Sequence, residues 1–400
     1  MAPERRNSTS RTAQRLAPFG TSIFGEVTWL AQDRGAINLG QGFPDFEGPP
    51  ELADAAFRAM RDGHNQYARP MGAVPLALAI SKQVERDHGL HRDPLTDVCV
   101  TSGATEAIAA ALLGTLDPGD AVLTFEPFYD SYPAITALAG ARFDTVPLHF
   151  PDFRIDFERL RSKVTPETKI LLLNAPHNPT GRVFDDEELE SLAAICIEHD
   201  LVAVCDDVYE HLWFDGARHR PLASLPGMGE RTITISSTGK TFSMTGWKIG
   251  WAHGSARLVA SVFAAHQFLT FATAHPLQHA MAYALETFDG PWLQRLRDEY
   301  EQRRQCLLDG LARSGFTAAR PSGSYFVMAR HDAFFDAADD PAEPDVAIAR
   351  RLIERTGVAA IPPSSFYREA VSEGRRLLRF AFCKRIETLQ AAMDRLAKGL

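Results

Sequence analysis

The sequence predicts an α/β protein with a large domain, whose mostly parallel central sheet is covered by helices, and a smaller α+β domain. Short apolar runs alternate with helix-length amphipathic runs through the middle of the chain. The apolar runs contain few polar residues, which indicates strands buried on both faces of a parallel sheet. After about residue 290 the pattern changes to a long charged helix followed by mixed strands and helices. These observations predict two domains, one built around the central sheet and a smaller one.

The elements follow in order. Strands are expected at 98–100, 121–125, 169–174, 201–207 and 232–237. Helices are expected at 106–116, 133–141, 185–200 and 293–315. We assign 45–288 to the large domain, 1–44 and 289–400 to the small domain, and a mobile tail to about 1–15.

Composition narrows the classes of function. The 400 residues are 45% hydrophobic and carry a net charge of -9, with no block of like charges. Neither nucleic acid nor an anionic membrane surface is therefore expected as a partner. The five cysteines form no C-x-x-C pair, and most lie in apolar runs, which is typical of core positions in a reducing compartment. With no signal peptide or membrane span recognised, we expect a cytoplasmic protein.

The stretch "SSTGKTFSMTGWKIG" (236–250) contains a Gly-Lys-Thr tripeptide, as a phosphate-binding P-loop does. A P-loop requires a glycine five residues before Gly239, but that position is Thr234, inside a predicted strand where no turn can begin. No G-x-G-x-x-G follows a strand either. The sequence thus excludes a nucleotide loop here.

Two histidines, His275 and His279, stand four residues apart. On a helix they could share a metal, but no carboxylate or cysteine accompanies them at ligand spacing. We expect packing or capping histidines and no metal.

A lysine flanked by small residues after a buried strand suits a Schiff base with an aldehyde cofactor such as pyridoxal phosphate. Lys240 is that lysine, and Asp206, at the end of the run "LVAVCDD", is an acid for the pyridine nitrogen. Strand alternation places Val208 on the same face as Asp206, where it could pack under the ring. A turn or helix-cap role for Asp206 stays open.

A phosphate site is indicated by "VTSGATEAIAAALLG" (100–114), which reads as a strand, a turn of small residues and a helix. The free amides of a helix N-terminus suit a phosphate dianion. Ser237 and Lys248 could add a hydroxyl and a positive charge.

Together these segments resemble the class I/II aminotransferases of PLP fold type I over nearly the whole chain. The markers are "INLGQGFPDF" (37–46), "NQYARPMG" (65–72), "TSGATEAI" (101–108), "EPFYDSY" (126–132), "NAPHNPTG" (174–181), "CDDVYE" (205–210), "PSGSYF" (321–326) and "LLRFAFCK" (377–384). Within the family the chain is most similar to the kynurenine/glutamine-transaminase K and methionine aminotransferase branch.

The resemblance implies a role for each matching residue. Lys240 would form the Schiff base, Asp206 would hold the pyridine nitrogen, and Tyr209 would act with them. The further residues that would hold the cofactor are Gly103, Ala104, Thr105, Tyr129, Asn178, Val208, Ser237, Lys248 and, from a second subunit, Tyr67. Those that would bind substrate are Arg379 at the α-carboxylate, Gly40, Asn178, Tyr129, Phe43, Phe268 and Phe366.

Ordinary structural roles are the alternatives. Arg379 could be a buried structural arginine, Asn178 and Tyr209 turn residues, and Tyr67 and Tyr129 core aromatics.

The resemblance implies a homodimeric, pyridoxal-phosphate-dependent transaminase that moves the amino group of an L-amino acid, large hydrophobic or aromatic, to a 2-oxo acid. A PLP-dependent cysteine-S-conjugate β-lyase or a specialised biosynthetic enzyme on the same fold is the alternative. A ligand sensor of a transcription regulator is a rival from another class, but the residues before 25 leave no room for a DNA-binding domain, and Lys240 is present.

Overall fold

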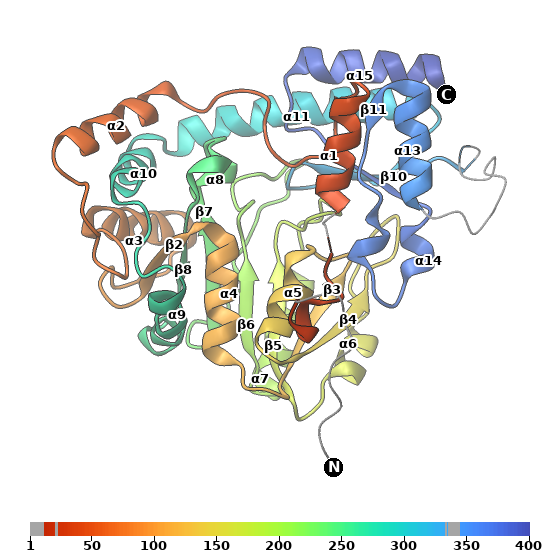
Figure 1. Ribbon diagram of the computed structural model, residues 1–400. Helices are drawn as coiled ribbons and strands as arrows, with labels where there is room; N and C mark the ends of the chain where they lie inside the picture. The colour runs from red at the N-terminus through yellow and green to blue at the C-terminus, as the bar shows by residue number, and fades with distance from the viewer. Residues whose placement is uncertain (1–11, 21–22, 333, 335–344) are drawn as a thin grey trace.

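A seven-stranded sheet forms the centre of the computed structural model, which describes residues 12–20, 23–332, 334 and 345–400 (Figure 1). The strand order is β2-β8-β7-β6-β5-β3-β4. The strands are β2 (Val98–Ser102), β3 (Ala121–Glu126), β4 (Arg142–Pro147), β5 (Thr168–Asn174), β6 (Val202–Asp206), β7 (Thr232–Ser237) and β8 (Ile249–His253). Strand β8 is antiparallel to both of its neighbours, β2 and β7, and the other six strands run in one direction. The mostly parallel sheet is therefore confirmed.

All five predicted strands are present, but β4 and β8 were not predicted. β4 is an edge strand that begins with the exposed Arg142 and includes Asp144, so it lacks the apolar run of a central strand. β8 begins inside the glycine- and lysine-rich stretch 236–250, where we predicted no strand. Thr234, the position that excluded the P-loop, lies within β7.

Helices cover both faces of this sheet. Ile170 and Leu172 of β5 belong to a core that includes side chains of α4, α5 and α9, whereas Leu171 and Leu173 belong to a second core with α7. The helices are α1 (Ile23–Asp33), α2 (Pro50–Arg61), α3 (Val74–His88), α4 (Gly103–Thr115), α5 (Ser131–Leu138), α6 (Phe157–Lys163), α7 (Asp186–Glu198), α8 (Thr238–Thr241), α9 (Ala256–Leu269), α10 (His275–Thr287), α11 (Gly290–Arg313), α13 (Asp345–Thr356), α14 (Val371–Gly374) and α15 (Ile386–Gly399). Short 3-10 turns are η1 (Gln14–Leu16), η2 (Leu222–Ser224), η3 (Thr245–Trp247) and η4 (Pro363–Phe366). Burial on both faces explains why the strand sequences are so apolar.

Two smaller sheets lie outside the central one. β10 (Phe326–Arg330) pairs antiparallel with β12 (Leu378–Ala381) and with β9 (Thr317–Ala318). β1 (Ile37–Asn38) pairs in parallel with β11 (Val358–Ala359), so early and late segments of the chain lie side by side. In Figure 1 the long helix α11 crosses above the central sheet, and α15 packs along α11. The predicted domain boundaries stay a prediction, and most of the predicted tail, 1–11, lies outside the described residues.

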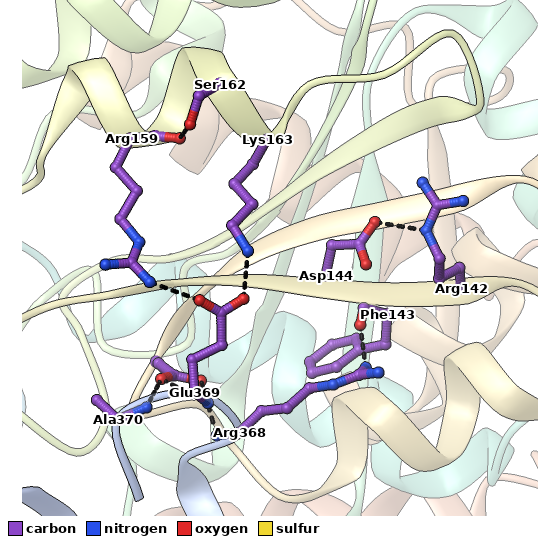
Figure 2. Close-up of polar contacts among 10 residues, drawn as sticks. Arg142, Phe143, Asp144, Arg159, Ser162, Lys163, Arg368, Glu369 and Ala370 are labelled. Atoms are coloured by element: carbon purple, nitrogen blue, oxygen red, sulfur yellow. Dashed lines mark hydrogen bonds and ion pairs between the residues drawn. The ribbon is translucent and has the colours of Figure 1, made fainter.

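The segment after η4 is held against the central sheet by carboxylates. The buried Glu126, at the end of β3, accepts hydrogen bonds from the backbone amides of Arg368, Glu369 and Ala370 at 2.6–3.0 Å. Figure 2 shows the Glu369 carboxylate between Arg159 and Lys163, with Arg159 Nη2 at 2.6 Å. The Arg368 guanidinium donates to the carbonyl of Phe143. These contacts tie the late segment to β3, β4 and α6.

The predicted core positions of most cysteines are confirmed, since Cys99, Cys196, Cys205 and Cys383 are buried. No described helix combines the length and apolar character needed to cross a bilayer.

Candidate active site

The carboxyl ends of four strands bring the predicted site residues to one edge of the central sheet. β2, β5, β6 and β7 run in the same direction, and ligands of open α/β sheets bind at this edge. Asp206 is the last residue of β6 and Ser237 the last of β7. A cavity of about 380 Å³ lies there.

Most predicted residues line this cavity. They are Phe43, Gly103, Ala104, Thr105, Tyr129, Asn178, Asp206, Val208, Tyr209, Ser237, Lys240, Lys248 and Arg379. Gly40 and Phe366 lie behind Arg379, the first accepting a hydrogen bond through its carbonyl and the second with its ring centroid 5.5 Å from the guanidinium carbon. Tyr67 and Phe268 do not line it, and their side chains are 81% and 85% exposed. The structure of one chain therefore brings together all but these two.

Lys240 projects into the cavity from the one-turn helix α8, directly after β7. Its Nζ donates to the carbonyl of Gly42 at 3.2 Å and lies 5.6 Å from the centroid of the Tyr325 ring. Burial, together with the nearby positive charges of Arg379 and Lys248, lowers its pKa to about 8 against the opposing effects of Cys383 and Asp206. A lysine of this kind is available as a neutral nucleophile or base near neutral pH.

Asp206 is fully buried at the cavity floor. Its Oδ2 accepts a hydrogen bond from the Tyr132 hydroxyl at 2.6 Å, whereas its Oδ1 has no partner among the described residues. Burial raises the pKa of this carboxyl to about 6, and the Tyr132 hydrogen bond opposes that rise. An unpaired buried carboxylate oxygen is costly unless a ligand supplies a donor.

The first turn of α4 forms one wall. Gly103 adopts a left-handed conformation (φ +76°), and a Cβ there would lie 3.0 Å from Lys248 Nζ. Lys248 is itself left-handed (φ +56°), which brings its ammonium over the start of α4. With Ser237 also lining the cavity, free amides, a hydroxyl and an ammonium converge, as an anion requires.

Arg379, in the middle of β12, is 2% exposed and has no carboxylate within 4.0 Å among the described residues. Its Nη1 donates to Asn178 Oδ1 at 3.1 Å and its Nη2 to the Gly40 carbonyl at 2.8 Å. The guanidinium carbon lies 4.2 Å from the centroid of the Phe326 ring. Burial lowers its pKa to about 10, so the group stays charged at neutral pH. A buried guanidinium held only by neutral groups can bind an anionic ligand.

Several site residues were not predicted. Phe24 reaches the cavity from α1, and no motif marks that helix. Phe326 lines the cavity and Tyr325 lies beneath it, with the Tyr325 hydroxyl donating to the Gly42 carbonyl at 2.6 Å. Both belong to "PSGSYF", and Tyr132 to "EPFYDSY", two quoted segments whose aromatic residues were available as candidates.

Comparison with known proteins decides the family. The model of the aminotransferases of class I and II matches residues 34–396. The chain belongs to the class I and II aminotransferases. This aminotransferase is 48% identical over 96% of its length to the probable N-succinyldiaminopimelate aminotransferase of Mycobacterium tuberculosis, of which 98% is covered. It is 35% identical to a kynurenine–oxoglutarate transaminase of Dictyostelium discoideum, over 98% and 97% of the two chains.

The fold is shared with solved relatives as well. The crystal structure of Escherichia coli YbdL, described as having a methionine aminotransferase function, superposes with a TM-score of 0.90 at 35% identity. The match covers 97% of this chain and 99% of that chain. The predicted family and the fold of the pyridoxal phosphate enzymes of fold type I are confirmed. The relatives include kynurenine and methionine aminotransferases, although the N-succinyldiaminopimelate aminotransferase is more similar to this chain than either.

Class I and II aminotransferases use pyridoxal 5′-phosphate, and the residues present fit this cofactor. The cavity holds a buried lysine with a lowered pKa, a carboxylate oxygen without a partner, and an anion site at the start of α4. These match the amine, acid and phosphate site that the cofactor requires.

Proposed function

We propose that this aminotransferase takes its amino group from an uncharged L-amino acid with a large hydrophobic or aromatic side chain. The observation behind the proposal is the charge of the cavity lining. Its cations among the described residues are Lys240, Lys248 and Arg379, and each has a role below. Phe24, Phe43 and other aromatic residues make up much of the remaining wall. A second anionic group on the donor would have no cation of its own there.

The roles follow from the contacts. Ser237, Lys248 and the first turn of α4 would hold the phosphate, and Asp206 would keep a proton on the pyridine nitrogen. Tyr209 and Asn178 would donate to the phenolic oxygen, with Tyr129 and Val208 against the ring. When bound, pyridoxal phosphate supplies an aldehyde that joins amines covalently and a ring that accepts electrons from the substrate's Cα.

The reacting substrate depends on two further groups of the protein. The Arg379 guanidinium would grip the α-carboxylate with paired hydrogen bonds, and so orient the Cα–H bond. Lys240, released as a neutral amine, would accept the proton from the substrate's Cα and would donate it to C4′ of the cofactor. Its pKa of about 8 leaves a substantial neutral fraction at neutral pH.

We also propose a homodimer whose two subunits share the active sites, in the cytoplasm. Tyr67, Phe268, Leu269 and Phe271 are all exposed large hydrophobic residues, and the Tyr67 ring lies 5.3 Å from that of Phe271. A gathering of exposed aromatics of this kind supports a subunit interface. Tyr67 would then reach the cofactor phosphate of the partner. The free thiols support a reducing compartment.

A second candidate donor is N-succinyldiaminopimelate, because the relative with 48% identity is named for it. Its distal carboxylates would need a cation from outside the described lining, such as one from a second subunit. Identity favours this donor, whereas the cavity lining favours an uncharged one.

A donor panel tests the proposal. Purified holoenzyme is given phenylalanine, tyrosine, kynurenine, methionine, aspartate or N-succinyldiaminopimelate with 2-oxoglutarate, and the 2-oxo acid product is quantified. We expect kcat/KM for the best uncharged donor to exceed that for aspartate and for N-succinyldiaminopimelate by about 100-fold or more. A preference for N-succinyldiaminopimelate would replace the first candidate with the second. Release of pyruvate and ammonia from a cysteine conjugate, without 2-oxo acid from the other donors, would indicate the β-lyase instead.

A further inference from the structure

Three histidines meet at the start of α10, outside the cavity of the active site. His275 and His279 of α10 face His64, which follows the end of α2. One ring nitrogen from each lies within 4.8 Å of the others. The His64 ring centroid is 3.7 Å from that of His279 and 5.1 Å from that of His275. The sequence supplied only the helical pair, and folding adds the third imidazole.

Helix packing explains why His64 reaches the pair. α2 packs on α10 through Ala55, Ala56 and Ala280, whose small side chains form one buried cluster. The amide of His64 donates to the carbonyl of Ala59 at 3.1 Å, which turns the chain at the end of α2 back toward α10. Helical spacing of four residues places the other two imidazoles on one face. The cluster is therefore fixed by two helices.

The hydrogen bonds prepare ring nitrogens as ligands. His275 Nδ1 lies 3.0 Å from the carbonyl of Gln66, which can only accept, so the Nδ1 proton is donated there and the Nε2 lone pair faces His279. His279 Nε2 lies 3.3 Å from this Nε2 and can donate to it, so a metal ion would take the place of that hydrogen bond. A backbone carbonyl that fixes the tautomer of a histidine in this way is the usual outer partner of a metal-bound imidazole.

The distances suit a tetrahedral ion. Zinc–nitrogen bonds of about 2.0–2.1 Å place two nitrogens of a tetrahedron about 3.3–3.4 Å apart. The 3.3 Å between the Nε2 atoms of His275 and His279 agrees with this edge. His64 requires a side-chain rotation to bring its nitrogen closer, and its half-buried position beside the pair allows one.

The chemistry of the ligands indicates the class of metal. None of the three histidines has a carboxylate within 4.0 Å in the part of the chain that the structure describes, so the protein would supply imidazole nitrogens alone. Imidazole ligands match the preference of borderline-soft divalent metals, whereas magnesium and calcium prefer oxygen.

We propose that His64, His275 and His279 form a binding site for one divalent transition-metal ion of the zinc class, with water in the fourth position. The ion joins the end of α2 to the start of α10. Gln66, whose carbonyl contacts His275, is followed directly by Tyr67. Metal binding would therefore fix the segment that carries Tyr67, which we propose reaches the cofactor phosphate in the second subunit. The site itself does not depend on the donor of the transamination.

The test is metal binding to the intact holoenzyme, with Co²⁺ as a spectroscopic probe and Zn²⁺ as its competitor. We expect one Co²⁺ per chain, visible absorption bands of a tetrahedral ion, and their loss when Zn²⁺ is added. His64→Gln and His279→Gln should each weaken binding by about 10- to 100-fold or more. His91→Gln removes an exposed histidine elsewhere on the surface and should leave binding unchanged.

Each other result overturns the proposal. No saturable binding means that the cluster is a packing arrangement. Binding that is lost in His279→Gln but unchanged in His64→Gln means that only the helical pair binds metal. X-ray absorption of the unsubstituted zinc-loaded holoenzyme counts the imidazoles without any variant, and fewer than three excludes the site.

Discussion

Asp206 illustrates how single atoms set the chemistry of this site. One of its carboxylate oxygens has a tyrosine donor and the other has no partner, although both are buried. Burial raises the pKa of the carboxyl to about 6. Even a small further destabilisation of the charged carboxylate would therefore leave Asp206 protonated at neutral pH. Tyr132, which touches Asp206 and does not line the cavity, is therefore a positioning residue.

Replacing Tyr132 by phenylalanine tests that role. The hydrogen bond to a charged group is worth about 1.5–3 kcal/mol, so its loss should raise the pKa of Asp206 further. We expect Tyr132→Phe to lower kcat/KM about 10-fold or more at neutral pH and to move the acid limb of the pH profile upward. Tyr283→Phe, which removes a hydroxyl outside the cavity, is the control. A uniform loss of activity with an unchanged pH profile would show that Tyr132 acts only through packing.

Lys240 gives a prediction about pH in the cofactor-free enzyme. Its neutral amine would be the nucleophile toward the aldehyde of the cofactor, and burial lowers the pKa to about 8. The rate of covalent cofactor capture should therefore rise about tenfold per pH unit below 8 and level off above it. Stopped-flow absorbance measures this rate, and an analogue without the aldehyde controls for simple binding. A rise that continues toward pH 10 would indicate an ordinary exposed lysine.

The positions of site residues were predictable where a motif fixes them and not where tertiary contacts do. Lys240, Asp206 and Asn178 stand in segments whose residue types match the chemistry, and the structure brings them to one cavity. Phe24 comes from a helix without a motif, and the partnership of Tyr132 with Asp206 depends on how α5 packs against the sheet. No local pattern in the sequence predicts which buried tyrosine will donate a hydrogen bond to which carboxylate.

At the scale of elements, strand burial was the reliable signal. Central parallel strands form uninterrupted apolar runs, so they were recognised, whereas the edge strand β4 includes Arg142 and Asp144 and the short β8 begins inside the stretch 236–250. The site depends on β8 nevertheless, because a Cβ at Gly250 would lie only 2.6 Å from the amide of Ala104. Close packing of β8 against the start of α4 requires glycine there.

The segment after η4 offers a prediction at the scale of elements. Glu126 is fully buried and satisfies three backbone amides, whereas Glu369 lies near the surface between two cations (Figure 2). Glu126→Gln should lower local stability by about 1–3 kcal/mol, because the NH2 group of glutamine cannot accept the hydrogen bonds that the second carboxylate oxygen accepts from the backbone amides. Hydrogen exchange at 368–370 should accelerate about 10-fold or more.

Glu369→Gln is the matched comparison for that experiment. Exposed ion pairs contribute about 0–1 kcal/mol, so this substitution should change the rate of hydrogen exchange at 368–370 only a little. The change should be smaller still at high salt, because salt screens exposed ion pairs. Equal effects of the two substitutions would contradict the distinction between buried and surface carboxylates.

At the scale of the whole molecule, the exposed Tyr67 leads to a test of shared active sites. Lys240→Ala and Tyr67→Ala each impair every site of their own dimers, but a mixed dimer has one site with neither change. Unfolding and refolding the two variants together should therefore restore activity at limiting cofactor concentration. Sedimentation of the parent should give a dimer. No recovery in mixtures that sediment as dimers would place Tyr67 in its own subunit's site or outside any site.

The pairing of β1 with β11 has a consequence for synthesis of the protein. Ile37 leaves the ribosome early, but its partner Val358 follows only when the chain is almost finished. Domains usually form as they emerge, so the sheet of residues 98–253 can assemble first while the early segment has no strand to join. The Gly40 carbonyl, which holds Arg379, reaches its place only with that late pairing. A nascent chain therefore lacks the proposed binding site for the substrate's α-carboxylate until translation is nearly complete.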